Sequence, residues 1–104
     1  MFQEVLMWIY NQLSNNKRIN CKLVYREDQS IKNVVVYFDG TLKLSIAALS
    51  GIDNSMSIES LFLDNNEVNY GENLHEWWSQ IVGEKRWSCS RELINTINSM
   101  FPTN

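Results

Sequence analysis

A single histidine with two nearby carboxylates is the first candidate for chemistry in this chain. Glu72 and Glu76 lie at positions i−3 and i+1 relative to His75, so a helix would gather them around its first turn. An imidazole acts as a general base only with a partner group and a pocket. A closed zinc site takes about four ligands, and this pattern offers two at most. We therefore expect a surface histidine that binds no metal.

Nucleophilic side chains also lack the neighbours that would activate them. A serine or cysteine nucleophile would have to borrow the same His75, and no Gly-x-Ser-x-Gly sequence occurs. Cys89 falls on the apolar face of an expected helix, and the distant Cys21 cannot form a Cys-x-x-Cys pair with it. We expect two buried or half-buried thiols. The sequence predicts no catalytic residue, no cofactor and no enzyme activity.

The charges are distributed unevenly along the chain. The protein has 9 Lys and Arg against 12 Asp and Glu, but residues 44–84 contain seven of the acids and no Lys or Arg. Residues 1–43 carry six bases and four acids, and residues 85–104 carry three bases and one acid. A run of carboxylates speeds encounter with a basic partner. The sequence predicts binding to a basic protein surface and not to nucleic acid, which needs a basic patch.

The candidate contacts are six carboxylates of this segment, with Tyr70 or Trp78 as an aromatic anchor beside them. Tyrosine and tryptophan are favoured near the centres of protein interfaces. A solvated surface is the alternative, because an acid at a turn or at a helix start has a local explanation. The candidate partner-binding residues are Asp53, Glu59, Asp64, Glu67, Tyr70, Glu72, Glu76 and Trp78.

The first element expected is an amphipathic helix that ends near Asn15 and Asn16. Phe2, Leu6, Ile9 and Leu13 recur at helical spacing with polar residues between them. No Lys or Arg precedes the apolar positions, and the polar interior fits neither a signal peptide nor a membrane span. We expect a cytosolic protein.

Alternating or β-branched runs predict strands at residues 21–26, 31–38, 41–46 and 56–63, with a short strand around Val68 and Tyr70. A loop is expected at residues 47–54. Asp39-Gly40 predicts a type I′ hairpin turn. The resulting register places Tyr37 opposite Leu42 and Val35 opposite Leu44 on the core side, with the pairs Phe38–Thr41, Val36–Lys43 and Val34–Ser45 on the other.

Two helices are expected after the strands. The first begins at Asn73 and ends at Gly83, with an apolar stripe formed by Leu74, Trp77, Trp78, Ile81 and Val82. Trp87 is expected in the connection, in a cation–π contact with Arg86. The second helix is capped by Ser88 or Ser90, and its apolar face consists of Cys89, Leu93, Ile97, Met100 and Phe101.

This order predicts a single α+β domain over residues 1–104. Its parts are an N-terminal helix, an antiparallel meander of three to four strands, and two C-terminal helices packed on one sheet face. The other face is expected to be partly open. Because Val34, Val36 and Phe38 fall on that second face, they offer a possible surface for a homodimer, and the chain could be a monomer or a homodimer.

The segment Leu74–Ile81, with Arg86-Trp87-Ser88 after it, resembles helical segments of bacterial toxin-immunity proteins of the contact-dependent growth inhibition type. The resemblance covers about the last third of the chain and extends to its small, acidic, aromatic-rich character. It implies a non-enzymatic inhibitor that neutralises a cognate, basic toxin domain by direct binding. A phage- or mobile-element-encoded inhibitor or adaptor of a host protein, and a small homodimeric structural protein, are the alternatives.

Overall fold

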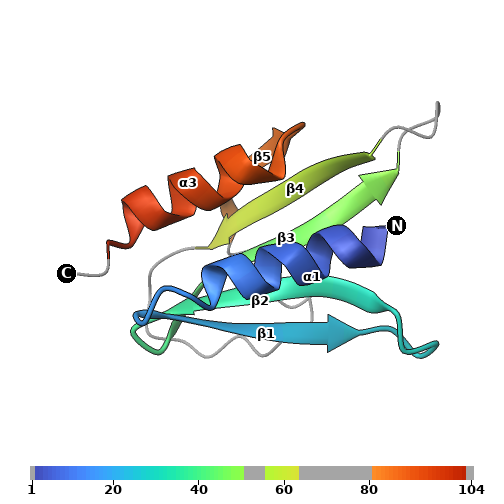
Figure 1. Cartoon of the computed structure of the whole chain (residues 1–104), viewed down its shortest axis with the longest axis horizontal. Helices are drawn as coiled ribbons and strands as arrows, with labels where there is room; N and C mark the ends of the chain where they lie inside the picture. Colours follow the sequence, from blue (N-terminus) through green and yellow to red (C-terminus); the bar gives the residue numbers. More distant parts are fainter. Residues whose placement is uncertain (1, 51–55, 64–80, 103–104) are drawn as a thin grey trace.

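Five antiparallel strands and two helices make up residues 2–50, 56–63 and 81–102, which the computed structural model describes (Figure 1). The strands follow one another across the sheet in the order β1-β2-β3-β4-β5. The α+β class and the N-terminal helix are confirmed. The elements are α1 (Phe2–Leu13), β1 (Ile19–Tyr25), β2 (Ile31–Phe38), β3 (Thr41–Ser50), β4 (Met56–Leu63), β5 (Ile81–Trp87) and α3 (Ser90–Met100).

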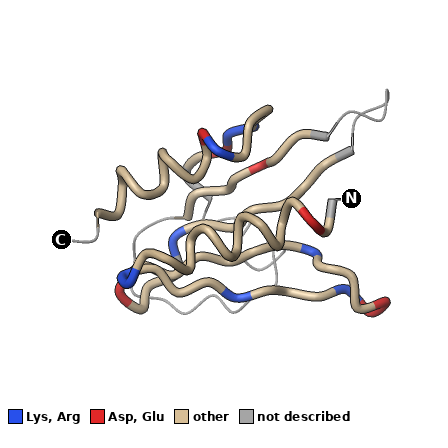
Figure 2. The backbone as a smooth tube through the Cα atoms, in the orientation of Figure 1, with Lys and Arg blue, Asp and Glu red and all other residues tan. Residues whose placement is uncertain are grey.

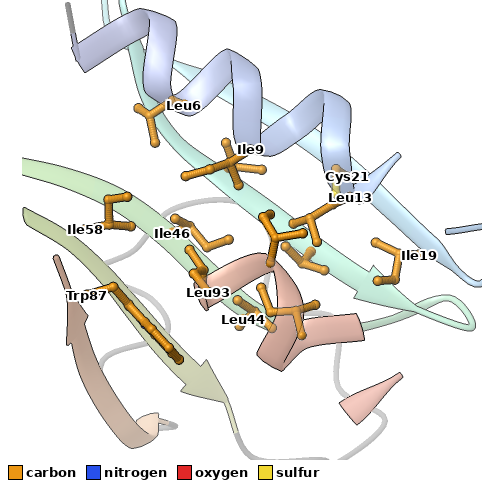
Figure 3. Close-up of a cluster of buried hydrophobic side chains, with 14 of the residues drawn as sticks. Leu6, Ile9, Leu13, Ile19, Cys21, Leu44, Ile46, Ile58, Trp87 and Leu93 are labelled. Carbon is orange, nitrogen blue, oxygen red and sulfur yellow. The ribbon is translucent and has the colours of Figure 1, made fainter. Parts of the chain in front are cut away.

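Both helices cover the same face of the sheet, and the main core lies between them and the strands (Figures 1 and 3). The stripe Leu6, Ile9 and Leu13 of α1 is buried there, as its helical spacing predicts. Burying one such side chain stabilises the fold by about 1.5–3 kcal/mol. The strands contribute Val34, Val36, Leu44, Ile46 and Ile58, and α3 contributes Leu93 and Ile97.

The turn between β2 and β3 has the predicted geometry. Asp39 and Gly40 adopt φ angles of 49° and 84°, as a type I′ turn requires at its two central positions. The flanking pairs Phe38–Thr41 and Tyr37–Leu42 also form as expected. The local sequence therefore determines the start of this hairpin.

Beyond these pairs the predicted register is wrong by one residue. A bulge between Val36 and Tyr37 shifts the ladder, so that Val36 lies opposite Leu44, Val35 opposite Ser45, and Val34 opposite Ile46. A two-residue turn specifies only its nearest pairs, and a bulge can re-aim the rest of the strand. The shift places Leu44 and Ile46 on the same face as Val36 and Val34, beneath the helices.

The bulge reverses the expected faces of β2. Val34 and Val36 are fully buried in the core beneath the helices, and the partly buried Phe38 packs against this core. The proposed homodimer surface on these three residues is therefore wrong. Val35 lies on the opposite face, where it is also fully buried. The expectation of a partly open second face fails at the centre of the sheet, where Asn33, Val35, Ser45 and Leu61 are all buried.

Two segments extend the sheet beyond the expected meander. β3 continues to Ser50, where a loop from Ala47 was expected, and β5 contains Ile81, Val82 and Gly83, where a helix end was expected. Ile81 and Val82 are β-branched and favour a strand, and β5 pairs with β4. Residues 73–80, Val68 and Tyr70 lie outside the described residues. Of the two expected C-terminal helices, α3 is the one that the described residues contain.

The apolar face of α3 is rotated from its expected position. Leu93, Ile97 and Phe101 are buried as predicted, and Ile94 joins them. Met100 is 47% exposed and Cys89 is exposed, so both assignments to the buried face are wrong. Cys89 itself is the N-cap residue and makes no side-chain capping bond. The expected serine cap is therefore wrong as well.

Candidate functional site

One of the eight candidate partner-binding residues lies within the described structure. Glu59 is on β4, on the face opposite the helices. The other seven stay predictions, because Asp53, Asp64, Glu67, Tyr70, Glu72, Glu76 and Trp78 lie outside the described residues, as does His75.

Glu59 lies beside a cation on the neighbouring strand. The register places it opposite Arg86 of β5, and the Arg86 Nε is 3.8 Å from the Glu59 Oε2. The Glu59 side chain is 17% exposed, whereas that of Arg86 is 67% exposed. The carboxylate thus offers little surface of its own, and part of its charge is balanced within the chain.

A second carboxylate adjoins Glu59 on the same face of the sheet. Glu84 of β5 lies opposite Leu61, two residues from Glu59, in the diagonal position where long side chains still meet. Burial raises the pKa of Glu59, and the charge of Glu84 raises it further, against a smaller opposing effect of Arg86. Both acids belong to the segment 44–84, so its described part contains one close pair of carboxylates.

Basic residues gather at the other edge of the sheet. The chain contains Lys17, Arg18, Lys22 and Arg26 between Glu4 and Glu27, with no Asp or Glu among them. They lie on β1 and on the connections at its two ends (Figure 2). The expectations from the sequence do not include this cationic run, although the charge count that reveals the acidic segment also reveals it.

Arg18 joins three parts of the chain at one end of the sheet. Its guanidinium donates to the Asp39 carboxylate and to the Pro102 carbonyl, each at 2.9 Å. The same group lies 4.3 Å from the centre of the Phe38 ring, and Phe38 stacks on Phe101 with 4.3 Å between ring centres. The Arg18 hydrogen bond lowers the pKa of Asp39, whereas the Asp39 hydrogen bond raises the pKa of Arg18. This cluster attaches the end of α3 to the β2–β3 turn.

Trp87 packs differently from the expected contact with Arg86. The Trp87 Nε1 donates to the Ser60 Oγ at 2.8 Å inside the core, and the Lys85 Nζ lies 4.1 Å from the centre of its ring. Strand alternation explains the change, because Lys85 and Trp87 share one face while Arg86 points to the other. The cation–π partner is therefore Lys85.

The two cysteines have opposite environments. Cys21 is buried, and desolvation raises the pKa of its thiol to about 12, so it stays protonated near neutral pH. Cys89 is exposed. Within residues 2–50, 56–63 and 81–102, no group of three or more His, Cys, Asp or Glu side chains could hold a metal ion.

Neither described helix is long and apolar enough to cross a membrane. Comparison of the chain with protein-family models, with curated proteins and with solved structures gave no match.

Proposed function

We propose that this protein is a non-enzymatic, protein-binding inhibitor of the immunity type, which neutralises a cognate toxin domain by covering a basic surface. The observation that carries the proposal is the segment 44–84, which holds seven carboxylates and no Lys or Arg. The flanking segments each carry two more bases than acids. Such a one-signed segment attracts a basic protein and repels an acidic one.

The pair Glu59 and Glu84 supports this proposal within the described residues. Burial, and after it the charge of Glu84 on the neighbouring strand, raise the pKa of Glu59, so the ionised carboxylate of Glu59 is unfavourable there. A lysine or arginine from a partner would lessen that penalty by adding positive charge beside it. Arg86 does this only in part, because its Nε lies 3.8 Å from Glu59 and its side chain is largely exposed.

The test of the proposal is co-expression with the product of the adjacent gene, followed by purification of the complex. We expect one-to-one binding, rescue of growth from the toxin, and weakening of the complex by added salt. Changing Glu67, Glu72 and Glu76 together to glutamine should weaken binding. The matched control changes Glu4, Glu27 and Glu92 to glutamine, which alters net charge equally outside the segment.

Three results would contradict the proposal. They are the absence of a complex, the absence of growth rescue, or an equal loss of binding in the two triple variants. Phage structural genes around this gene, in place of a toxin gene, would favour the alternative of an inhibitor or adaptor of a host protein.

A further inference from the structure

The edge of the sheet that β5 forms is exposed on both faces (Figure 1). Glu84, Lys85 and Arg86 follow one another along the strand, and all three are exposed. Successive side chains of a strand point to opposite faces. Lys85 lies on the face that the helices cover, so its exposure shows that α3 stops short of this edge. Glu84 and Arg86 lie on the other face, which is therefore uncovered at this edge as well.

The backbone of Lys85 points inward, toward β4. The Ser60 Oγ donates to the Lys85 carbonyl at 3.4 Å, which places this carbonyl on the β4 side. A second bond gives the same phase. The Asp39 N–H donates to the Arg18 carbonyl at 3.1 Å, and hydrogen-bonded pairs recur at every second residue of an antiparallel ladder. Carried across the sheet by the register, this phase makes Ser60 and Lys85 a hydrogen-bonded pair.

The backbone groups of Glu84 and Arg86 point outward as a consequence. Both residues alternate with Lys85 along the strand, so their N–H and C=O groups face away from β4. Within the described residues, no other backbone group bonds to them. The edge thus presents two donors and two acceptors, in the spacing that another antiparallel strand matches.

The charges along this edge complement those of a second copy. When two β5 strands pair antiparallel about a twofold axis at Lys85, Glu84 of each copy lies opposite Arg86 of the other. Opposite charges directly across a ladder stabilise it. Glu84 and Arg86 are also the residues whose backbone groups point outward. One register therefore satisfies the backbone and the side chains together.

The neighbouring registers do not satisfy both. Sliding the second copy by two residues places Arg86 opposite Arg86 or Glu84 opposite Glu84, and like charges directly across a ladder destabilise it. Sliding it by one residue sets outward backbone groups against inward ones. The order Glu84-Lys85-Arg86 therefore selects a single antiparallel register.

The contacts of these charges within one chain leave them able to bind a second copy. The Arg86 Nε lies 3.8 Å from the Glu59 Oε2, and the Arg86 side chain is 67% exposed. A guanidinium has five N–H donors, so a second carboxylate can bind beside the first. Glu84 has the carboxylate of Glu59 as its neighbour, and a cation from the second copy would offset this like charge.

Lys85 meets its own counterpart at the twofold axis, but its position limits the repulsion. Its Nζ lies 4.1 Å from the centre of the Trp87 ring, so the ammonium is directed along its own strand and not across the axis. It is also exposed, where water weakens the interaction of like charges. Gly83 lies opposite Trp87 of the second copy and brings no side chain against it. The helix face of the ladder therefore adds only a small cost.

We propose that two copies of this chain associate through β5, with Lys85 at the twofold axis and with Glu84 of each copy opposite Arg86 of the other. The two sheets then form one continuous sheet, with the helices of both copies on the same face. A ladder this short buries little surface, so the association is weak and depends on concentration. The occupant of this edge is a second copy and not a toxin, so the inference goes beyond the proposed function.

Sedimentation equilibrium of two charge-reversed variants of the full chain tests the inference. The average mass of the parent should rise toward that of two chains between about 1 µM and about 1 mM. Glu84→Arg alone and Arg86→Glu alone should each keep the mass of one chain, because each variant sets like charges against one another. An equimolar mixture of the two variants should associate, since every pair across the ladder is then opposite in sign.

The matched controls reverse equal charges at the other edge of the sheet. Glu27→Arg and Lys17→Glu change exposed residues near β1, and each alone should associate as the parent does. Thermal melting followed by circular dichroism confirms that every variant is folded.

Amide hydrogen exchange of the parent chain tests the ladder without any substitution. The Glu84 and Arg86 amides point outward, so they should exchange rapidly at low protein concentration and about tenfold more slowly at high concentration. The Lys85 amide bonds to β4 and should be protected at every concentration, which makes it the internal control.

A parent that keeps the mass of one chain over the whole range would overturn the inference. So would association of either charge-reversed variant alone, or a mixture of the two folded variants that does not associate. Slow exchange of Glu84 and Arg86 at low concentration would show that the chain itself covers this edge. None of these results bears on the binding of a basic partner, which is tested on Glu67, Glu72 and Glu76.

Discussion

The Asn16 side chain donates from its Nδ2 to the backbone carbonyl of Phe101 at 2.7 Å, which joins the end of α1 to the end of α3. The same Nδ2 donates to the Asn98 Oδ1 at 3.1 Å, and the Asn16 Oδ1 accepts from the Arg18 N–H at 3.0 Å. Asn16 is 4% exposed, so these bonds are shielded from water. One amide thus connects both helices with the start of β1.

Asn16→Ala should lower the free energy of unfolding by about 2–3 kcal/mol, because the buried carbonyl of Phe101 and the partly buried N–H of Arg18 lose their partner. Urea denaturation followed by circular dichroism measures the loss. The control is Asn15→Ala, an exposed neighbour whose change should cost about 0.5 kcal/mol or less. Equal losses in the two variants would contradict this role for Asn16.

Stability should fall in acid partly through Asp39. The Arg18 hydrogen bond lowers the pKa of Asp39 in the folded state, so the folded carboxylate holds its proton less tightly than the unfolded one. This contribution is present above the unfolded pKa, about 3.9, and is lost as pH falls through the folded value. Asp39→Asn keeps a residue suited to the turn and should remove this part of the acid dependence.

The measurement for Asp39 is the melting temperature of the parent and of Asp39→Asn between neutral pH and pH 2. The two curves should converge at the acid end. A parallel offset at every pH would show that the carboxylate does not act through its ionisation. When Arg18→Gln is present in both proteins, the difference between Asp39 and Asp39→Asn should no longer depend on pH in this way, since the pairing cation is gone.

Glu59→Gln should stabilise the protein at neutral pH. Burial and the charge of Glu84 raise the pKa of Glu59, so its ionised form is unfavourable in the folded state. The protonated Glu59 carboxyl contributes to stability in full below the unfolded pKa of about 4.3. This contribution is lost as pH rises through the folded pKa. The gain from glutamine should therefore appear near pH 7 and vanish by about pH 4.

Urea denaturation of Glu59→Gln at both pH values checks this expectation, with the exposed Glu92→Gln as the matched control. A loss of stability near pH 7 would mean that attraction to Arg86 outweighs burial and the repulsion by Glu84.

The two thiols should differ in reactivity. Cys89 is exposed, whereas Cys21 is buried and its pKa is raised to about 12, so a thiol reagent should label Cys89 alone in the native protein. Denaturant should expose both. Mass spectrometry of the labelled chain counts the modified thiols, and rapid native labelling of Cys21 would contradict the buried position.

Local patterns in the sequence determined several elements of this protein. The helical spacing of Leu6, Ile9 and Leu13 predicts an amphipathic helix without any information about what this helix packs against. Asp39-Gly40 makes a type I′ turn because both positions tolerate positive φ. The acidic run in residues 44–84 is also a property of the sequence alone, and among its candidate contacts the structure describes only Glu59.

The tertiary structure decided what depends on contacts between distant residues. A bulge at Lys43 of β3 brings Leu44 and Ile46 under the helices with Val36 and Val34, where packing against α1 and α3 favours them. Ile81 and Gly83 belong to a strand because β4 offers them partners in Leu63 and Phe62. The Glu59–Glu84 pair and the bonds of Asn16 join residues far apart in the chain, and local periodicity carries no information about which segments meet.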